Sequence, residues 1–154
     1  MKSKQIGIII FIFLLVLVYV FNKGDVTLAS QDNVKIQRIT SRGFELTSNI
    51  NLYNPNVLSC TIKSIHERFR INGMVMGILD QEINQGIPGR KESAFPVSIR
   101  FTREDYNRAA GNDTIDLTKI NIEVEGEIVF TNVFSGGKIL VHQGLKYSST
   151  ARQQ

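Results

Sequence analysis

Apolar and polar residues alternate along most of the chain from residue 43 onward. Between residues 43 and 54, the even positions carry the apolar residues Phe44, Leu46, Ile50 and Leu52, whereas most odd positions are polar. This period of two places every second side chain on the same face, as in a β-strand that buries one face. The same period recurs in the segments 65–71, 95–102, 120–130 and 139–147. The pattern therefore predicts a domain built mainly of half-buried strands.

Turn-favouring residues interrupt this alternation about every ten positions, as they do between the strands of an antiparallel sandwich or barrel. A parallel sheet would need helical crossovers, which the pattern lacks. Within the segment 65–71 the two faces are well separated. The apolar face consists of Ile65, Phe69 and Ile71, and the polar face of His66, Arg68 and Arg70. We therefore predict an antiparallel, all-β domain.

One segment departs from the strand pattern. Thr102 begins a sequence typical of a capping box, and Gly111 is a natural helix stop. We predict a short helix between these two residues, with Tyr106 facing the core and the helix connecting two strands across an end of the sheets.

The chain begins with an apolar segment of a different kind. Residues 6–21 form a run of 16 residues without a charge, and Lys2 and Lys4 precede it. A helix of this run would be about 24 Å long, less than the roughly 30 Å of a hydrocarbon core. We predict an uncleaved transmembrane signal anchor. A cleaved signal peptide is the alternative, with its nearest plausible site at Thr27-Leu28-Ala29. The residues expected to contact lipid in this anchor include Ile6, Ile10, Phe13, Leu17 and Phe21.

These segments give the expected domain organisation. It comprises a cytoplasmic stub (1–5), the anchor (6–21), a linker (22–33), the β-sandwich (34–147) and a flexible tail (148–154). The basic residues before the apolar run favour a cytoplasmic N-terminus. The sandwich is then expected outside the cytoplasm, in the periplasm if the source is a Gram-negative bacterium. No cysteine precedes Cys60, which excludes a lipid-modified cysteine at the end of the apolar run.

The charge of the chain argues against nucleic acid as a partner. Two of the 18 basic residues precede the apolar run and all 14 acidic residues follow it, so the chain from residue 22 onward carries a net charge of +2. Basic residues are not gathered with aromatic ones in any stretch. Nucleic-acid binding is therefore not predicted.

Few residues suggest catalysis or metal binding. His66 lies on the polar face of its strand and His142 opposes the apolar face of the last strand, and neither has a second metal ligand at a suitable spacing. Cys60 alternates in phase with apolar neighbours, which favours a buried role over that of a nucleophile. Three acidic residues at every second position, Glu123, Glu125 and Glu127, share one strand face. Such a row of like charges is typical of a solvated surface. We predict no enzyme activity, no metal site and no cofactor.

Several short motifs occur in a recognisable order. They are Asn54-Pro55-Asn56 at the end of a strand, Asn72-Gly73 with Gly77 shortly after, Ile87-Pro88 before a strand, and Val124-Glu125-Gly126 in a late strand. Together they resemble the LEA type 2 family, whose domain is also called WHy (water stress and hypersensitive response), over roughly residues 34–147. The resemblance implies an immunoglobulin- or fibronectin-like β-sandwich of about seven strands with one short helix. It supplies no catalytic residues, and we expect Asn54, Pro55, Asn56, Asn72, Gly73, Gly77 and Gly126 to be structural.

Three functions are consistent with these features. The leading hypothesis is a non-catalytic binding or scaffolding module that contacts membrane lipid through its N-terminal helix and a protein partner in the cell envelope. The family resemblance implies a second, which is protection during desiccation or other stress. The third is binding of a lipid or another hydrophobic ligand between the sheets. The sequence predicts no particular oligomeric state.

Overall fold

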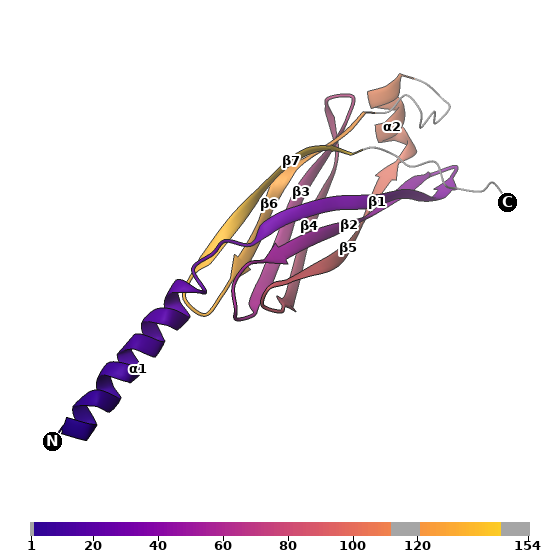
Figure 1. Cartoon of the computed structure of the whole chain (residues 1–154). Helices are drawn as coiled ribbons and strands as arrows, with labels where there is room; N and C mark the ends of the chain where they lie inside the picture. The colour runs from indigo at the N-terminus through magenta and orange to yellow at the C-terminus, as the bar shows by residue number, and fades with distance from the viewer. Residues whose placement is uncertain (1, 112–120, 146–154) are drawn as a thin grey trace.

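Two antiparallel sheets form the body of the structure, a computed structural model that describes residues 2–111 and 121–145, leaving aside the side chains of residues 2–6, 33, 37–39 and 110. One sheet has the order β1-β2-β5 and the other the order β4-β3-β6-β7 (Figure 1). The first contains β1 (Thr27–Thr40), β2 (Gly43–Asn54) and β5 (Lys91–Thr102). The second contains β3 (Cys60–Ile71), β4 (Met74–Ile87), β6 (Ile122–Thr131) and β7 (Gly136–Leu145).

The two sheets pack face to face around one apolar core. Phe44 stacks on Phe101 within the three-stranded sheet, with ring centroids 5.0 Å apart. Phe101 also meets Phe69 of the other sheet edge to face at 6.2 Å. Edge-to-face and offset pairs of this kind are favourable beyond the area that they bury. These rings therefore help to hold the two layers together.

The strand alternation predicted from the sequence is confirmed. The even positions of β2 named above are buried, and so are Ile65, Phe69 and Ile71 of β3. β2 pairs with β5 without a register shift, from Gly43 opposite Thr102 to Asn54 opposite Lys91. The fold is all-β and antiparallel, as predicted, and neither sheet closes on itself.

The first strand begins earlier than the sequence suggested. β1 starts at Thr27, which pairs with Tyr53, so much of the segment 22–33 that was predicted as a linker belongs to the sheet. The pairing of β1 with β2 contains register shifts, one of them between Leu28 and Ser30. Each irregularity changes which positions face inward, and this obscures the period of two on which the sequence prediction depended.

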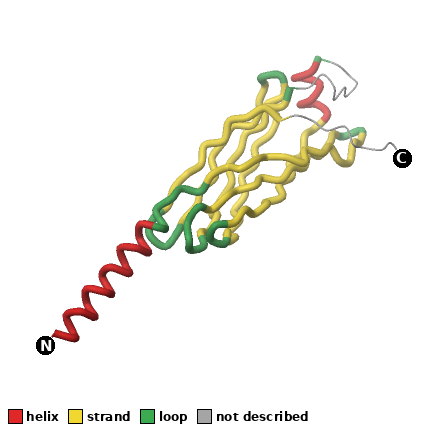
Figure 2. Tube along the Cα trace, viewed as in Figure 1, coloured by secondary structure: helices red, strands yellow, loops and turns green. Residues whose placement is uncertain are grey.

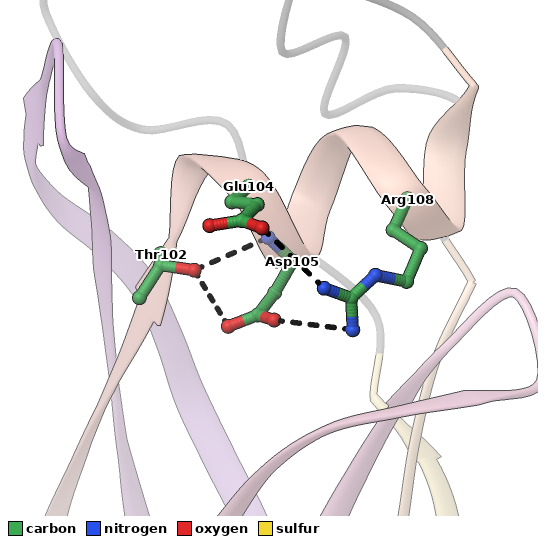
Figure 3. Close-up of polar contacts among 4 residues, drawn as sticks. All are labelled: Thr102, Glu104, Asp105 and Arg108. Atoms are coloured by element: carbon green, nitrogen blue, oxygen red, sulfur yellow. Dashed lines mark hydrogen bonds and ion pairs between the residues drawn. The ribbon is translucent and has the colours of Figure 1, made fainter.

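The predicted short helix is present as α2 (Arg103–Ala110). Thr102 caps it: its hydroxyl oxygen accepts a hydrogen bond from the Asp105 amide at 3.1 Å and donates one to the Asp105 carboxylate at 2.6 Å (Figure 3). Arg108 lies beside the carboxylates of Glu104 and Asp105, at 3.7 and 3.8 Å. Gly111 ends the helix with φ of 67°, and Tyr106 is buried as predicted. The cluster in Figure 3 is therefore explained by helix capping.

The N-terminal apolar segment forms the helix α1 (Lys2–Val20), which projects from one end of the sheets (Figures 1 and 2). Within the described part of the chain, no helix combines the length and the apolar character required to cross a membrane. β7 ends at Leu145, and the predicted tail at 148–154 lies outside the described residues.

Candidate functional site

The junction between α1 and the sheets is held by specific polar contacts. Asn22 is buried just after the helix, and its side-chain amide donates to the carbonyl of Val18 at 2.6 Å. Its side-chain oxygen accepts from the amide of Leu58 at 2.6 Å. The Phe21 carbonyl accepts from the amide of Val57 at 3.3 Å. These bonds satisfy carbonyl groups at the helix end and connect α1 directly to the β2–β3 loop.

The motif Asn54-Pro55-Asn56 forms this same loop. Asn54 is buried, and its side-chain amide nitrogen lies within hydrogen-bonding distance of the carbonyls of Leu58 (3.0 Å), Ile87 (3.1 Å) and Pro88 (3.3 Å). Its side-chain oxygen accepts from the Asn56 amide at 3.0 Å. One side chain thus fixes its own loop and joins it to the β4–β5 loop.

Asn56 extends these contacts toward the helix. It is buried, and its side chain exchanges two hydrogen bonds with the backbone of Gly24, at 2.7 and 2.8 Å. Its carbonyl accepts from the amide of Arg90 at 2.8 Å. Pro55 is exposed and lies close to Gly24, since a Cβ added to Gly24 would come within 3.0 Å of its ring. The motif therefore lies at the helix end of the domain.

The remaining motif residues lie elsewhere. Asn72 and Gly73 form the β3–β4 turn with φ of 49° and 83°, values that favour asparagine and glycine. A Cβ at Gly77 would approach the side chain of Ile99 to 2.6 Å, so this glycine lets the two sheets pack closely. Gly126 pairs with Glu67 on β3, and a Cβ there would lie 2.1 Å from the His66 carbonyl oxygen.

Four of the predicted anchor residues, Ile6, Ile10, Phe13 and Leu17, lie on α1, and Phe21 directly follows it. Ile10, Phe13 and Phe21 are exposed and Leu17 is half-buried, whereas the side chain of Ile6 lies outside the described ones. Every side chain from Ile8 to Phe21 other than Leu17 is exposed. The helix therefore presents apolar surface on all sides.

The structure also reveals a buried carboxylate that the sequence reasoning missed. Glu67 is 1% exposed and occupies the inward register of β3, between Ile65 and Phe69. Gln31 of β1 donates from its side-chain nitrogen to the Glu67 carboxylate at 3.4 Å and to the Ser48 hydroxyl at 3.3 Å. Gln143 of β7 donates to the side-chain oxygen of Gln31. These four residues form a polar cluster between the sheets.

The electrostatics of this cluster favour a neutral Glu67. One carboxylate oxygen, Oε1, is buried without a hydrogen-bond partner. Burial raises the pKa of Glu67 to about 7, and the hydrogen bond from Gln31 offsets only part of this effect. The desolvated charge is disfavoured because the residues that reach it are themselves uncharged. The sequence could have indicated this burial, because position 67 falls on the apolar face of the alternating segment 65–71.

The other candidate residues show no arrangement for catalysis. His66 pairs with Asp80 at 2.7 Å and His142 with Glu125 at 3.5 Å, on the outer face of the four-stranded sheet. Cys60 is buried, and its burial raises the thiol pKa, which disfavours the reactive thiolate. Among the described residues, no three His, Cys, Asp or Glu side chains gather as metal ligands would. That the chain is not an enzyme stays a prediction.

Comparison with known proteins relates the chain to solved structures through its fold. No family model and no curated protein matches it. A crystal structure of an Archaeoglobus fulgidus protein has a TM-score of 0.60 at 11% identity, covering 82% of this chain and 100% of its own. The solution structure of an Arabidopsis thaliana protein has a TM-score of 0.57 at 12% identity, covering 81% and 87%. A candidate late embryogenesis abundant (LEA) protein has a TM-score of 0.49 at 16% identity, covering 94% and 88%.

These likenesses support the all-β fold that the resemblance to the LEA type 2 (WHy) family implied. At 11% and 12% identity, the two structures with the higher TM-scores show a shared fold alone. The β-sandwich architecture is therefore the class that this chain shares with known proteins, and its activity has to be argued from its own residues.

Proposed function

We propose that this chain is a non-catalytic β-sandwich of the immunoglobulin or fibronectin type that is attached to a membrane by α1 and displays its sheets to a partner outside the cytoplasm. The observation that carries the proposal is the exposure of the apolar side chains of α1. Contiguous exposed apolar surface of this extent is rare on proteins that stay in water. Transfer of each such side chain to an apolar surrounding is favourable by about 1.5–3 kcal/mol.

The dimensions of α1 support attachment to lipid. Its uncharged residues belong to the run 6–21, which as a helix corresponds to about 24 Å, about 6 Å less than the roughly 30 Å of a hydrocarbon core. Bilayers accommodate a small mismatch at modest cost by thinning locally. Lys2 and Lys4 precede the apolar residues, which favours an N-terminus on the cytoplasmic side and sheets on the opposite side.

The outer face of the four-stranded sheet supports the display of a binding surface. A shallow groove runs there over the backbone of Glu67 and Gly126. Ile78 on β4 and Leu140 on β7 line it and are 66% and 80% exposed. Charged side chains, among them Asp80, surround these two residues. Apolar residues surrounded by charged ones match the composition of a protein interface, which has an apolar centre and a polar rim.

Attachment to lipid is tested by flotation of the full chain with phosphatidylcholine vesicles. The variant Phe13→Lys/Leu17→Lys places two charges in α1, and each is expected to cost about 2.5–3.5 kcal/mol in a hydrocarbon core. The matched control is Phe13→Ile/Leu17→Ile, which keeps the helix apolar. We expect the wild type and the control to float and the lysine variant to remain in the aqueous fraction. A wild-type chain that does not float, or a lysine variant that floats equally, refutes the attachment.

Stress protection and binding of a hydrophobic ligand between the sheets stay predictions of the sequence. The structural likenesses concern the fold and do not favour either one.

A further inference from the structure

An apolar surface surrounds the point where α1 leaves the sheets. It consists of Val57 and Leu58 in the β2–β3 loop and Val133 and Phe134 in the β6–β7 loop, and we call these four residues the collar. Their side chains are 48%, 37%, 69% and 43% exposed. Loops at the end of a sandwich are normally polar, because their residues face water. Four exposed apolar residues on two separate loops therefore require an explanation.

The collar is held against the last turn of α1. The amides of Val57 and Leu58 bind the backbone of Phe21 and the side chain of Asn22, as described above. From the other loop, Phe134 meets the ring of Tyr19 edge to face, with centroids 5.7 Å apart. Asn132 donates to the Asn22 carbonyl at 3.4 Å. Both loops thus touch the helix, and their apolar residues continue its exposed apolar surface.

The direction of α1 determines which end of the domain would face a membrane. The helix continues the long axis of the sheets outward from the end that carries these loops (Figures 1 and 2). If α1 enters a bilayer, the collar faces the same bilayer surface. The hydrogen bonds of Asn22 and Asn56 fix the orientation of the domain relative to α1, so we do not expect a flexible linker between them.

The length of the apolar run provides a second argument. The uncharged residues 6–21 span about 24 Å as a helix, about 6 Å less than a hydrocarbon core. The collar adds apolar surface at the end of this run. Its aromatic ring, Phe134, packs on Tyr19 at the end of this run, and tyrosine is enriched at membrane–water interfaces.

We propose that the collar inserts into the interfacial layer of the bilayer, so that the sandwich stands directly on the lipid surface with its helix end against it. This inference rests on the proposed attachment through α1. The surface is apolar, and the exposed charges that follow the helix, Lys23 and Asp25, are of opposite sign. Insertion therefore depends on contact with the acyl chains and glycerol region, and vesicles without anionic lipid suffice.

The chain contains no tryptophan, so one introduced tryptophan reports a single position. Phe134→Trp places the reporter in the collar. Met74→Trp is the matched control, because Met74 is also an exposed apolar residue (47%) but begins β4, next to the turn at the opposite end of β3. The 12 residues of β3 separate the two ends by about 40 Å. Val133→Trp is a second collar reporter if Phe134→Trp fails to fold.

The full-length variants are reconstituted into phosphatidylcholine vesicles, and the same samples are tested by flotation. We expect blue-shifted emission from Phe134→Trp and at least threefold stronger quenching by lipids brominated near the glycerol end of the acyl chain than for Met74→Trp. Equal, weak quenching of the collar and control reporters in vesicles that do carry the protein overturns the collar proposal alone. Failure of the wild-type chain to float instead overturns the proposed attachment.

Discussion

Replacing Glu67 by glutamine is expected to remove most of a pH dependence of folding stability. The side chain is buried between the sheets with one oxygen unpartnered, and its pKa is raised from 4.5 to about 7. A difference of about 2.5 units between the unfolded and folded states corresponds to about 3 kcal/mol. Water that reaches the group through the half-buried Gln31 and Gln143 would reduce this figure.

The sign follows from which state binds the proton. Below pH 4.5 the carboxyl is protonated in both states, and its contribution to the free energy of unfolding is fully present. Between pH 4.5 and about 7 the unfolded chain loses the proton while the folded protein keeps it, so stability falls as pH rises. Above about pH 7 the folded protein holds a buried charge and no further loss occurs. Glu67→Gln is neutral throughout, so it should equal the wild type at pH 4.5 and exceed its stability at pH 8.

Urea unfolding followed by circular dichroism in mild detergent at pH 4.5, 6, 7 and 8 measures this difference. The matched control is Glu82→Gln, which neutralises an exposed carboxylate on β4. His66 and His142 are present in all three proteins, so the difference between the variants and the wild type isolates each carboxylate. If the free energy of unfolding falls equally for the wild type and Glu67→Gln between pH 4.5 and 8, the inference that Glu67 is buried in its protonated form is refuted.

Two further substitutions test the close contacts. Gly126→Ala should destabilise the fold by about 3 kcal/mol or more, because the new Cβ would lie 2.1 Å from a backbone oxygen of the neighbouring strand. The control Gly144→Ala, with nothing within 4 Å of its Cβ, should differ little from the wild type in thermal unfolding. Equal melting temperatures for the two variants would contradict the close approach at Gly126. Asn54→Ala leaves buried carbonyls without their donor and should lower the free energy of unfolding in urea by about 1–3 kcal/mol. The control Asn49→Ala, on the same strand, should change it by less than about 0.5 kcal/mol. Similar unfolding midpoints for both variants would show that the Asn54 hydrogen bonds contribute nothing measurable.

The faces of β2 and β5 could be predicted from the sequence, and so could those of β3, whose residues 64–69 pair regularly with both neighbouring strands. β2 and β5 pair without a shift, so a period of two in the sequence corresponds directly to two faces of the sheet. β1 could not be predicted in the same way, because its register shifts interrupt the period. The helix α2 was predictable because a cap is a local signal, carried by Thr102 and Gly111 within one short segment.

The sequence alone determined the strand faces, the short helix and the apolar N-terminal segment, because each follows from the spacing of nearby residues. Only the tertiary structure decided which distant segments meet. Gln31, Glu67 and Gln143 come from three strands, and their polar cluster exists because the two sheets pack face to face. The collar likewise forms only where loops around residues 57 and 133 reach the end of α1. Such contacts depend on chain closure across long separations, which local periodicity does not encode.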